Sequence, residues 1–250
     1  MSSPALSTKR AFRFQELGLV VVILVLGALL TFFGGTVKIP VVEKNSGGKW
    51  ERVFVTNAQG EQEAAVKDVN KFLNSRTLAQ LSKDTSFVAI MAVGMTVVII
   101  AGGIDLSVGA TYALASVLAA LFFNRYGPEG THATNSGAVV ALGMAICIGA
   151  GAMCGAVNGG LLVALKVHPF IITLGTMTIF RGIAFVITNG QSVGSFPAAF
   201  RALVRWPGND EADPNQLSLT PLLVMIFVTI IGAIYLRRLA AGRRVYAVGG

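Results

Sequence analysis

Charged residues are scarce in this sequence, and the residue patterns that build catalytic or metal sites are missing from it. Only 13% of the 250 residues are charged, against about 25% in a typical soluble domain. We find no metal-spaced His/Cys cluster, no Gly-x-Ser-x-Gly elbow, no paired carboxylates within an apolar run and no phosphate-binding GxxxxGK[ST] pattern. These absences argue against an enzyme. If the protein uses ATP, another chain must hydrolyse it.

Cysteine is also rare, with Cys147 and Cys154 the only two. They lie seven residues apart in one expected helix, about 10 Å along its axis, which is too far for a disulfide. We therefore interpret both as small packing residues.

What the sequence has instead is apolar residues, which make up 54% of the chain. About 20 apolar residues are needed to span a bilayer. The composition therefore predicts an all-α, polytopic transmembrane helical bundle with about six spans. The uncharged or nearly uncharged runs are 17–37, 85–104, 106–124, a stretch within 133–165, 167–191 and 216–236.

The net charge of +8 does not indicate nucleic acid, because the basic residues gather at the ends of apolar runs, as expected beside anionic membrane lipid. Basic residues flank both ends, so residues 1–16 and 237–250 are expected in the cytoplasm. An even number of spans follows, with 17–37 as the first helix and 85–236 holding five further segments. Residues 38–84 then form a small extracytoplasmic insertion. We expect a hairpin around Asn45–Gly48 and an amphipathic helix over Glu61–Ser75.

The octapeptide Gly102–Gly109 holds Asp105, the only charge between Thr85 and Asn124. Gly102 and Gly103 favour the end of the preceding helix, and Asp105 can cap the next one by accepting hydrogen bonds from its free N–H groups. The run is either a capped turn or a polar hinge on a translocation path, and both readings can hold together.

A stripe of small residues spaced four apart lies in the fourth apolar segment and predicts close packing against another helix. Its members are Gly143, Cys147, Gly151, Gly155 and Gly159. Asn158 lies beside the stripe and can supply an interhelical hydrogen bond.

Arg181 lies about 12 residues into the fifth segment, where an arginine should face the bundle interior, a water cavity or a carboxylate. An Asp105–Arg181 pair is one hypothesis, and snorkelling of Arg181 to an interface is the competing one. We take Asp105, Asn158, Arg181 and Asn189 as the polar candidates for a pathway, and Gly102, Gly103, Gly109, Gly151, Gly155 and Gly159 as hinge or packing positions.

Four ordered stretches resemble the permease subunits of bacterial ABC importers for monosaccharides, of the ribose, xylose and galactoside type. The resemblance runs from about Phe72 to the end of the chain. The stretches are Gly94–Gly109, Ala156–Gly159 leading into Pro169–Met177, Arg181–Ala184 with Thr188–Gln191, and Gly242–Gly250.

The resemblance implies a multi-pass protein of the bacterial inner membrane that is not itself catalytic and carries no cofactor. Separate ATP-binding cassette subunits would bind ATP, a second permease subunit would complete the pathway, and a periplasmic or lipid-anchored binding protein would deliver the sugar. Gly242, Arg243, Arg244 and Tyr246 would lie at the start of the cytoplasmic loop that couples to the ATPase.

The sequence departs from this resemblance in two places. The outer insertion is longer than usual, and such permeases continue with a helical loop and more spans, which implies either a truncated chain or a second chain that supplies the remainder. The sequence leaves two alternatives open, an ion- or proton-coupled secondary transporter that uses Asp105 and Arg181, and a non-transporting membrane scaffold.

Overall fold

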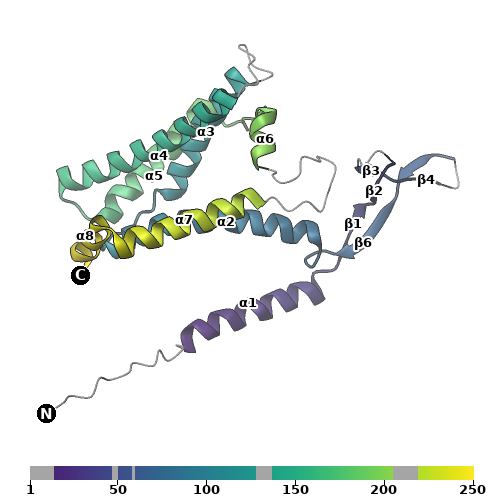
Figure 1. The fold of residues 1–250 in the computed structure, drawn as a ribbon, viewed down its shortest axis with the longest axis horizontal. Helices are drawn as coiled ribbons and strands as arrows, with labels where there is room; N and C mark the ends of the chain where they lie inside the picture. The colour runs from purple at the N-terminus through teal and green to yellow at the C-terminus, as the bar shows by residue number, and fades with distance from the viewer. Residues whose placement is uncertain (1–13, 47–49, 58–59, 128–136, 205–218) are drawn as a thin grey trace. The chain divides into compact units, whose positions relative to one another are not determined.

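A computed structural model describes residues 14–46, 50–57, 60–127, 137–204 and 219–250. The chain divides into two compact units, residues 1–80 with 210–216 and residues 81–209 with 217–250. The first unit carries a small β element, and the second holds most of the helices (Figure 1).

The first unit begins with helix α1 (Phe14–Phe33) and continues into six short strands that form three antiparallel pairs. Strand β1 (Thr36–Pro40) pairs with β6 (Val66–Asn70). The other pairs are β2 (Val42–Lys44) with β3 (Trp50–Arg52), and β4 (Phe54–Thr56) with β5 (Gln62–Ala64). The second and third pairs are therefore arms that branch from the β1–β6 stem.

The stem and the two arms meet at a closed triangle of backbone hydrogen bonds. The Val41 N–H donates to the Ala65 carbonyl at 2.7 Å, the Ala65 N–H to the Val53 carbonyl at 2.7 Å, and the Val53 N–H to the Val41 carbonyl at 3.0 Å. This triangle pairs the backbone groups where the strands diverge, so the branch point leaves none of these six groups without a partner.

The segments on either side of the hairpin turn expected around Asn45–Gly48 pair as β2 and β3, and residues 47–49 of that turn lie outside the described residues. The helix expected over Glu61–Ser75 is wrong, because this segment forms β5 and β6. Pairing with β1 takes up the backbone groups of β6, and the Asn70 carboxamide then accepts from the Phe72 and Leu73 N–H groups at 2.9 and 2.7 Å. Such local side-chain bonds compete with helix formation. The next helix begins only after Asn74, whose Oδ1 accepts from the Thr77 N–H at 2.8 Å.

The chain continues with α2 (Ser75–Ile100), α3 (Val108–Tyr126), α4 (Gly137–Leu165), α5 (Pro169–Thr188), α6 (Ala198–Val204), α7 (Leu219–Arg238) and α8 (Ala240–Gly249). Among the described residues, five helices are long and apolar enough to cross a membrane, namely α2, α3, α4, α5 and α7. The described apolar part of α1, Leu17–Phe33, is shorter. The predicted fold class, a polytopic helical membrane protein, is confirmed, and the described helices supply five clear spans plus this shorter apolar helix.

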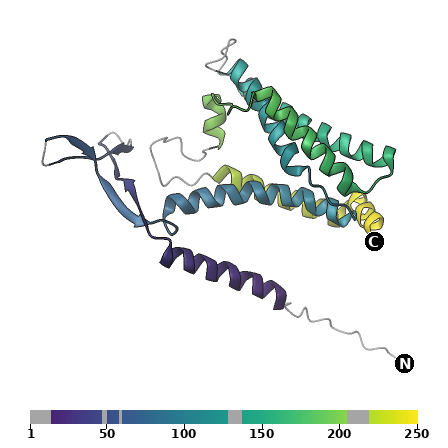
Figure 2. The same cartoon turned by 180° about the vertical axis from the view of Figure 1, so that it is seen from behind.

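Helices α3, α4 and α5 pack side by side, and α2 runs along α7 (Figures 1 and 2). The buried core of the three-helix group joins Ala110 and Leu114 of α3 to Cys154 of α4 and to Phe180 and Ala184 of α5. Alanine and cysteine at these positions let the helix backbones approach closely, in line with the packing role expected for Cys154.

The glycine stripe of α4 contacts another described helix at one of its ends. A Cβ on Gly143 would overlap the ring of Phe123, whereas nothing lies within 4 Å of a Cβ built on Gly151, Gly155 or Gly159. The packing expectation for these three glycines is therefore not met within the described residues. The reason is rotational, since α3 and α5 pack on the face of α4 that buries Ala150 and Cys154, one residue out of step with the stripe.

Substituting Gly143 and Gly155 of the stripe should give different results. Gly143→Ala should destabilise the protein by about 1–3 kcal/mol, because the Phe123 ring is only 2% exposed and cannot easily move away. Gly155→Ala, with open space at the new methyl, is the matched control and should be neutral or slightly stabilising. Thermal unfolding of the purified full chain in detergent measures both, and an equal loss in the two variants would contradict this packing.

Candidate functional site

The turn between α2 and α3 contains the glycines predicted to end a helix, and it does end one. Gly102 adopts a φ of +80°, its N–H donates to the Ile99 carbonyl at 3.0 Å, and the Gly103 N–H donates to the Val98 carbonyl at 3.0 Å. These two bonds form a Schellman motif, which needs a residue that tolerates positive φ at the first of the two positions. Gly103 is buried, and a Cβ there would lie 3.3 Å from the Val98 side chain and 3.7 Å from Pro169. Gly109 has open space around it in the first turn of α3.

The Asp105 carboxylate accepts hydrogen bonds from Ser107 and not from the N–H groups in the first turn of α3. Its Oδ1 accepts from the Ser107 backbone N–H at 2.7 Å and from the Ser107 hydroxyl at 2.6 Å. Ser107 is itself the N-cap of α3, and its side chain makes no capping bond. The prediction that Asp105 bonds the free N–H groups of the helix is therefore wrong, because the carboxylate closes an Asx turn one residue before them.

The Ser107 hydroxyl connects this turn to α4. Ser107 is fully buried, and its oxygen accepts from the Asn158 Nδ2 at 2.7 Å. The predicted interhelical bond of Asn158 is confirmed. The Asn158 Oδ1 is buried without a hydrogen-bond partner, so this amide is held from one side only.

Thr173 connects the same turn to α5. Its hydroxyl oxygen accepts from the Leu106 N–H at 3.1 Å, and its proton can go to the carbonyl of Ile104 or of Phe170, each at 3.3 Å. Asp105, Ser107, Asn158 and Thr173 are called the polar junction below. It ties α3, α4 and α5 together through hydrogen bonds, so its role is to position these helices.

Ser107 and Thr173 are the members of the polar junction that were not predicted as functional residues from the sequence. A signal exists for Ser107, because the residue two positions after an aspartate is the one whose backbone N–H donates to the carboxylate in an Asx turn. Thr173 lies in an apolar run with nothing beside it in sequence to mark it. Its role depends on a contact with Leu106, which lies 67 residues earlier in the chain.

Arg181 does not pair with Asp105, and that hypothesis is wrong. Thr173 lies beside the α2–α3 turn, and Arg181 follows it by eight residues, about 12 Å further along α5 at 1.5 Å per residue. The exposed Arg181 instead lines a cavity between α3 and α5. An intramembrane arginine that borders a cavity is one of the arrangements expected for such a residue.

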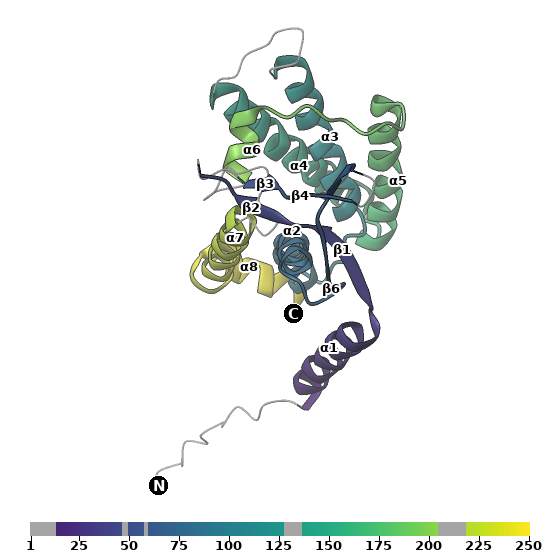
Figure 3. The same cartoon turned by 90° about the vertical axis from the view of Figure 1, so that its right-hand side faces the viewer.

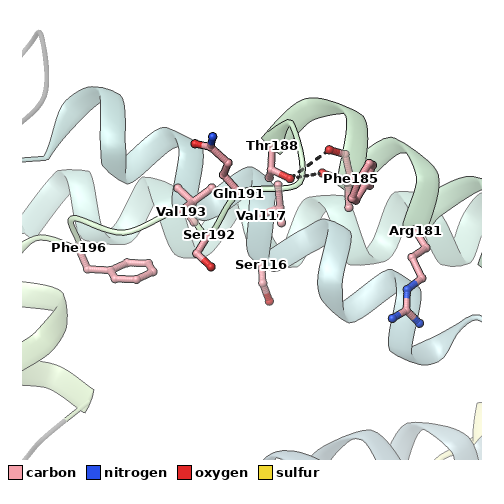
Figure 4. Close-up of a pocket in the computed structure, with 11 residues that line it drawn as sticks. Ser116, Val117, Arg181, Phe185, Thr188, Gln191, Ser192, Val193 and Phe196 are labelled. Atoms are coloured by element: carbon pink, nitrogen blue, oxygen red, sulfur yellow. Dashed lines mark hydrogen bonds between the residues drawn. The ribbon is translucent and has the colours of Figure 1, made fainter.

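The cavity is an open groove with a volume of about 470 Å³ and lies toward the carboxyl end of α5 (Figure 4). The chain that follows α5 forms one side of it and leads to α6. Figure 4 shows Thr188 and Gln191 near one edge and Arg181 further back along α5. The lining residues are Ser116, Val117, Ala120, Arg181, Ala184, Phe185, Thr188, Gln191, Ser192, Val193 and Phe196.

Asn189 lies at the carboxyl end of α5. It is the C-cap of α5, with a left-handed φ of 52° and its N–H directed to the carbonyls of Phe185 and Val186. It is not among the residues that line the cavity. Its position shapes the turn that brings Gln191 to the cavity wall.

The carboxyl-terminal helix α8 packs against α7 (Figure 3). Gly242 is buried where a Cβ would overlap the backbone of Tyr235 and Leu236. Arg243, Arg244 and Tyr246 are exposed, and the Arg243 guanidinium donates to the Arg238 carbonyl at 3.3 Å. The four residues singled out in this stretch thus divide into one packing glycine and three surface side chains.

Comparison with known proteins places most of this chain in one sequence family. Residues 77–250 match the family described as branched-chain amino acid transport system / permease component. Over 186 residues the chain is 30% identical to the autoinducer 2 import system permease protein LsrD of Escherichia coli K12 and, with the same figures, to LsrD of Shigella flexneri. The aligned part is 72% of this chain and 51% of each relative, so the chain spans about half the length of the curated relatives it matches. No solved structure matches.

The polar junction predicts a measurable coupling between Asp105 and Ser107. Asp105→Ala removes two hydrogen bonds to a charged acceptor and should lower the free energy of unfolding by about 2 kcal/mol. Asp105→Asn keeps an oxygen acceptor and should cost less than half as much. In a double-mutant cycle with Ser107→Ala, the coupling energy should exceed about 0.5 kcal/mol. Additive losses in detergent unfolding would show that the two side chains act independently.

Proposed function

Because the chain belongs to the family of branched-chain amino acid transport system permease components, we propose that it is a transmembrane permease subunit of an ATP-driven ABC importer for a monosaccharide. The observation that carries this proposal is the family match over residues 77–250, which takes in every helix from α3 to α8 and nearly all of α2. The match leaves out the β element, which we infer to be an addition to the transport machinery.

Support for a sugar cargo comes from the motifs of the sequence and from the relatives. The stretches around Gly94–Gly109 and Arg181–Gln191 resemble monosaccharide permeases, and LsrD is named as an autoinducer 2 import permease. A charge relay between Asp105 and Arg181, which an ion-coupled transporter would use, has no support in the geometry, since Asp105 is bonded to Ser107 and Arg181 lies further along α5.

We place both termini in the cytoplasm, on the basis of the basic residues that flank them. Lys166, between α4 and α5, then lies on the cytoplasmic side, and the carboxyl end of α5 with its cavity lies on the outer side. The three-armed β element lies outside as well. This arrangement directs the cavity toward an exported binding protein and α8 toward ATP-binding subunits.

The proposed partners are two ATP-binding cassette subunits, a second permease subunit and an exported sugar-binding protein. ATP would bind to the cassette subunits and not to this chain. The exposed Arg243, Arg244 and Tyr246 of α8 offer a surface for them at the cytoplasmic end of α7. A basic surface of this kind fits an acidic patch on a partner.

The proposal predicts ATP-dependent uptake of a neutral sugar by the complete importer. Proteoliposomes that hold the full gene product with its cognate ATPase and binding protein should accumulate labelled D-ribose, D-xylose or D-galactose when ATP is supplied. An uncoupler should have no effect on this uptake. Uptake that persists without the ATPase and collapses with the uncoupler would identify an ion-coupled transporter instead.

A charge reversal on α8 tests the proposed coupling surface. Arg244→Glu should lower ATP-driven uptake at least about tenfold by placing like charge against an acidic partner, with membrane abundance unchanged. Arg76→Glu, at an exposed position near the start of α2, is the matched control and should leave uptake within about twofold. Equal uptake by the two variants would remove α8 from the interface.

A further inference from the structure

The cavity between α3 and α5 combines an apolar wall with polar groups that lie well apart. Val117 and Ala184 contribute aliphatic surface, and Phe185 and Phe196 contribute aromatic surface. Arg181 and Thr188 are seven residues apart on α5, about 10 Å along its axis. A ligand that satisfies both ends of the cavity must therefore carry polar groups at more than one place.

The two polar ends have opposite hydrogen-bonding character. The Arg181 guanidinium has five donors and no acceptor. The Thr188 hydroxyl proton is already directed to the carbonyls of Ala184 and Phe185, at 3.0 and 3.2 Å. Only the lone pairs of Thr188 remain for a ligand, so this end accepts. The amide of Gln191 and the hydroxyls of Ser116 and Ser192 can do either.

Phe196, on the aromatic side of the cavity, belongs to a cluster of aromatic rings. The Phe196 ring lies 6.1 Å from that of Phe123 and 5.7 Å from that of Phe200. Phe123 in turn lies 5.1 Å from Phe200 and is buried against Gly143 of α4. This cluster fixes the segment between α5 and α6 against the three-helix core, and it gives the cavity a preformed apolar face.

These features disfavour three classes of ligand. A cation would be repelled by Arg181, and a compact anion at Arg181 would leave the accepting end at Thr188 unpaired. A purely apolar molecule would desolvate the guanidinium without compensation. A hydroxyl group both donates and accepts, so a ligand with several hydroxyls on a carbon ring can use both ends at once.

We propose that this cavity is a binding site for a neutral polyhydroxylated solute, with Arg181 donating to its hydroxyls, Thr188 accepting from them, and Phe185 and Phe196 covering its C–H faces. The site deepens the proposed function, on which its role as a cargo site rests. A polyol held there would be the sugar on its way into the pathway.

Cysteine protection tests the ligand class directly. Ser192→Cys places a thiol on the exposed cavity lining, and its labelling by a neutral methanethiosulfonate reagent is measured in the full chain, with the parent protein as the blank for Cys147 and Cys154. D-galactose, D-ribose or D-xylose should slow the labelling at millimolar concentration. D-galacturonate and cyclohexanol, which add a charge or remove hydroxyls, should protect no better than the best neutral sugar.

Failure of all three neutral sugars to protect, up to about 100 mM, would overturn the proposal, because a site with so weak an affinity would stay almost empty at the millimolar concentrations expected to protect it. Stronger protection by D-galacturonate than by every neutral sugar would also overturn it, since the cavity would then be an anion site. Stronger protection by cyclohexanol would identify an apolar pocket and overturn it likewise.

A matched pair of threonines tests the role of the accepting end. Thr188→Val should raise the sugar concentration for half-protection about threefold or more. Thr178→Val is the control, because its hydroxyl bonds the Leu174 carbonyl at 3.2 Å in the same way and does not line the cavity. An equal shift in both variants would overturn the assignment of Thr188. The labelling needs no ATPase, so its failure is distinguishable from a failure of ATP-driven uptake.

Discussion

The arrangement of α3, α4 and α5 depends on the hydrogen bonds made by the buried hydroxyl of Ser107. Apolar surroundings cannot hydrogen-bond a peptide group, so a chain that turns between two membrane helices must satisfy its polar atoms internally. Here the carboxylate of Asp105 takes the N–H and the hydroxyl of Ser107, and the Ser107 oxygen then accepts from Asn158 of α4. Thr173 of α5 holds Leu106 from the other side. Ser107 thereby ties the amino end of α3 to α4, and the adjacent Leu106 ties it to α5.

The packed core of α3, α4 and α5 connects the polar junction to the cavity and keeps the spacing of these helices along its length. Small residues at Ala110 and Cys154 let the three helices approach closely, and Phe180 and Ala184 continue the contact along α5. Further along, the Phe123 ring lies against Gly143 and anchors Phe196 and Phe200. The cavity is thus built between helices whose spacing is fixed at both ends, which favours a preformed site over one that must assemble around its ligand.

Much of this follows from the sequence because it depends on local rules. Apolar runs predict the spans, Gly102 and Gly103 predict the end of α2, and the ordered motifs predict the permease family, which the match over residues 77–250 confirms. Predictions from the sequence fail where contacts between distant residues determine the local structure. The segment Glu61–Ser75, expected to be a helix, forms β5 and β6 because β4 and β1 pair with them. The stripe at Gly151–Gly159 is rotated away from α3, and Arg181 lies about 12 Å along α5 from Thr173, which contacts the turn that holds Asp105. Each case depends on a contact between residues far apart in the chain, which spacing alone does not encode.

The proposal that this chain is the membrane subunit of an ATP-driven importer, with a structural turn at Asp105 and a solute cavity at Arg181, can be tested on the assembled complex. The most direct measurement is ATP hydrolysis by the complex purified through this chain from cells that express its cognate subunits. We expect an ATP-binding subunit to co-purify with the chain and the sugar-loaded binding protein to accelerate its hydrolysis of ATP. Purification of the chain without any ATPase, or hydrolysis that the loaded binding protein leaves unchanged, would show that the chain is not such a subunit.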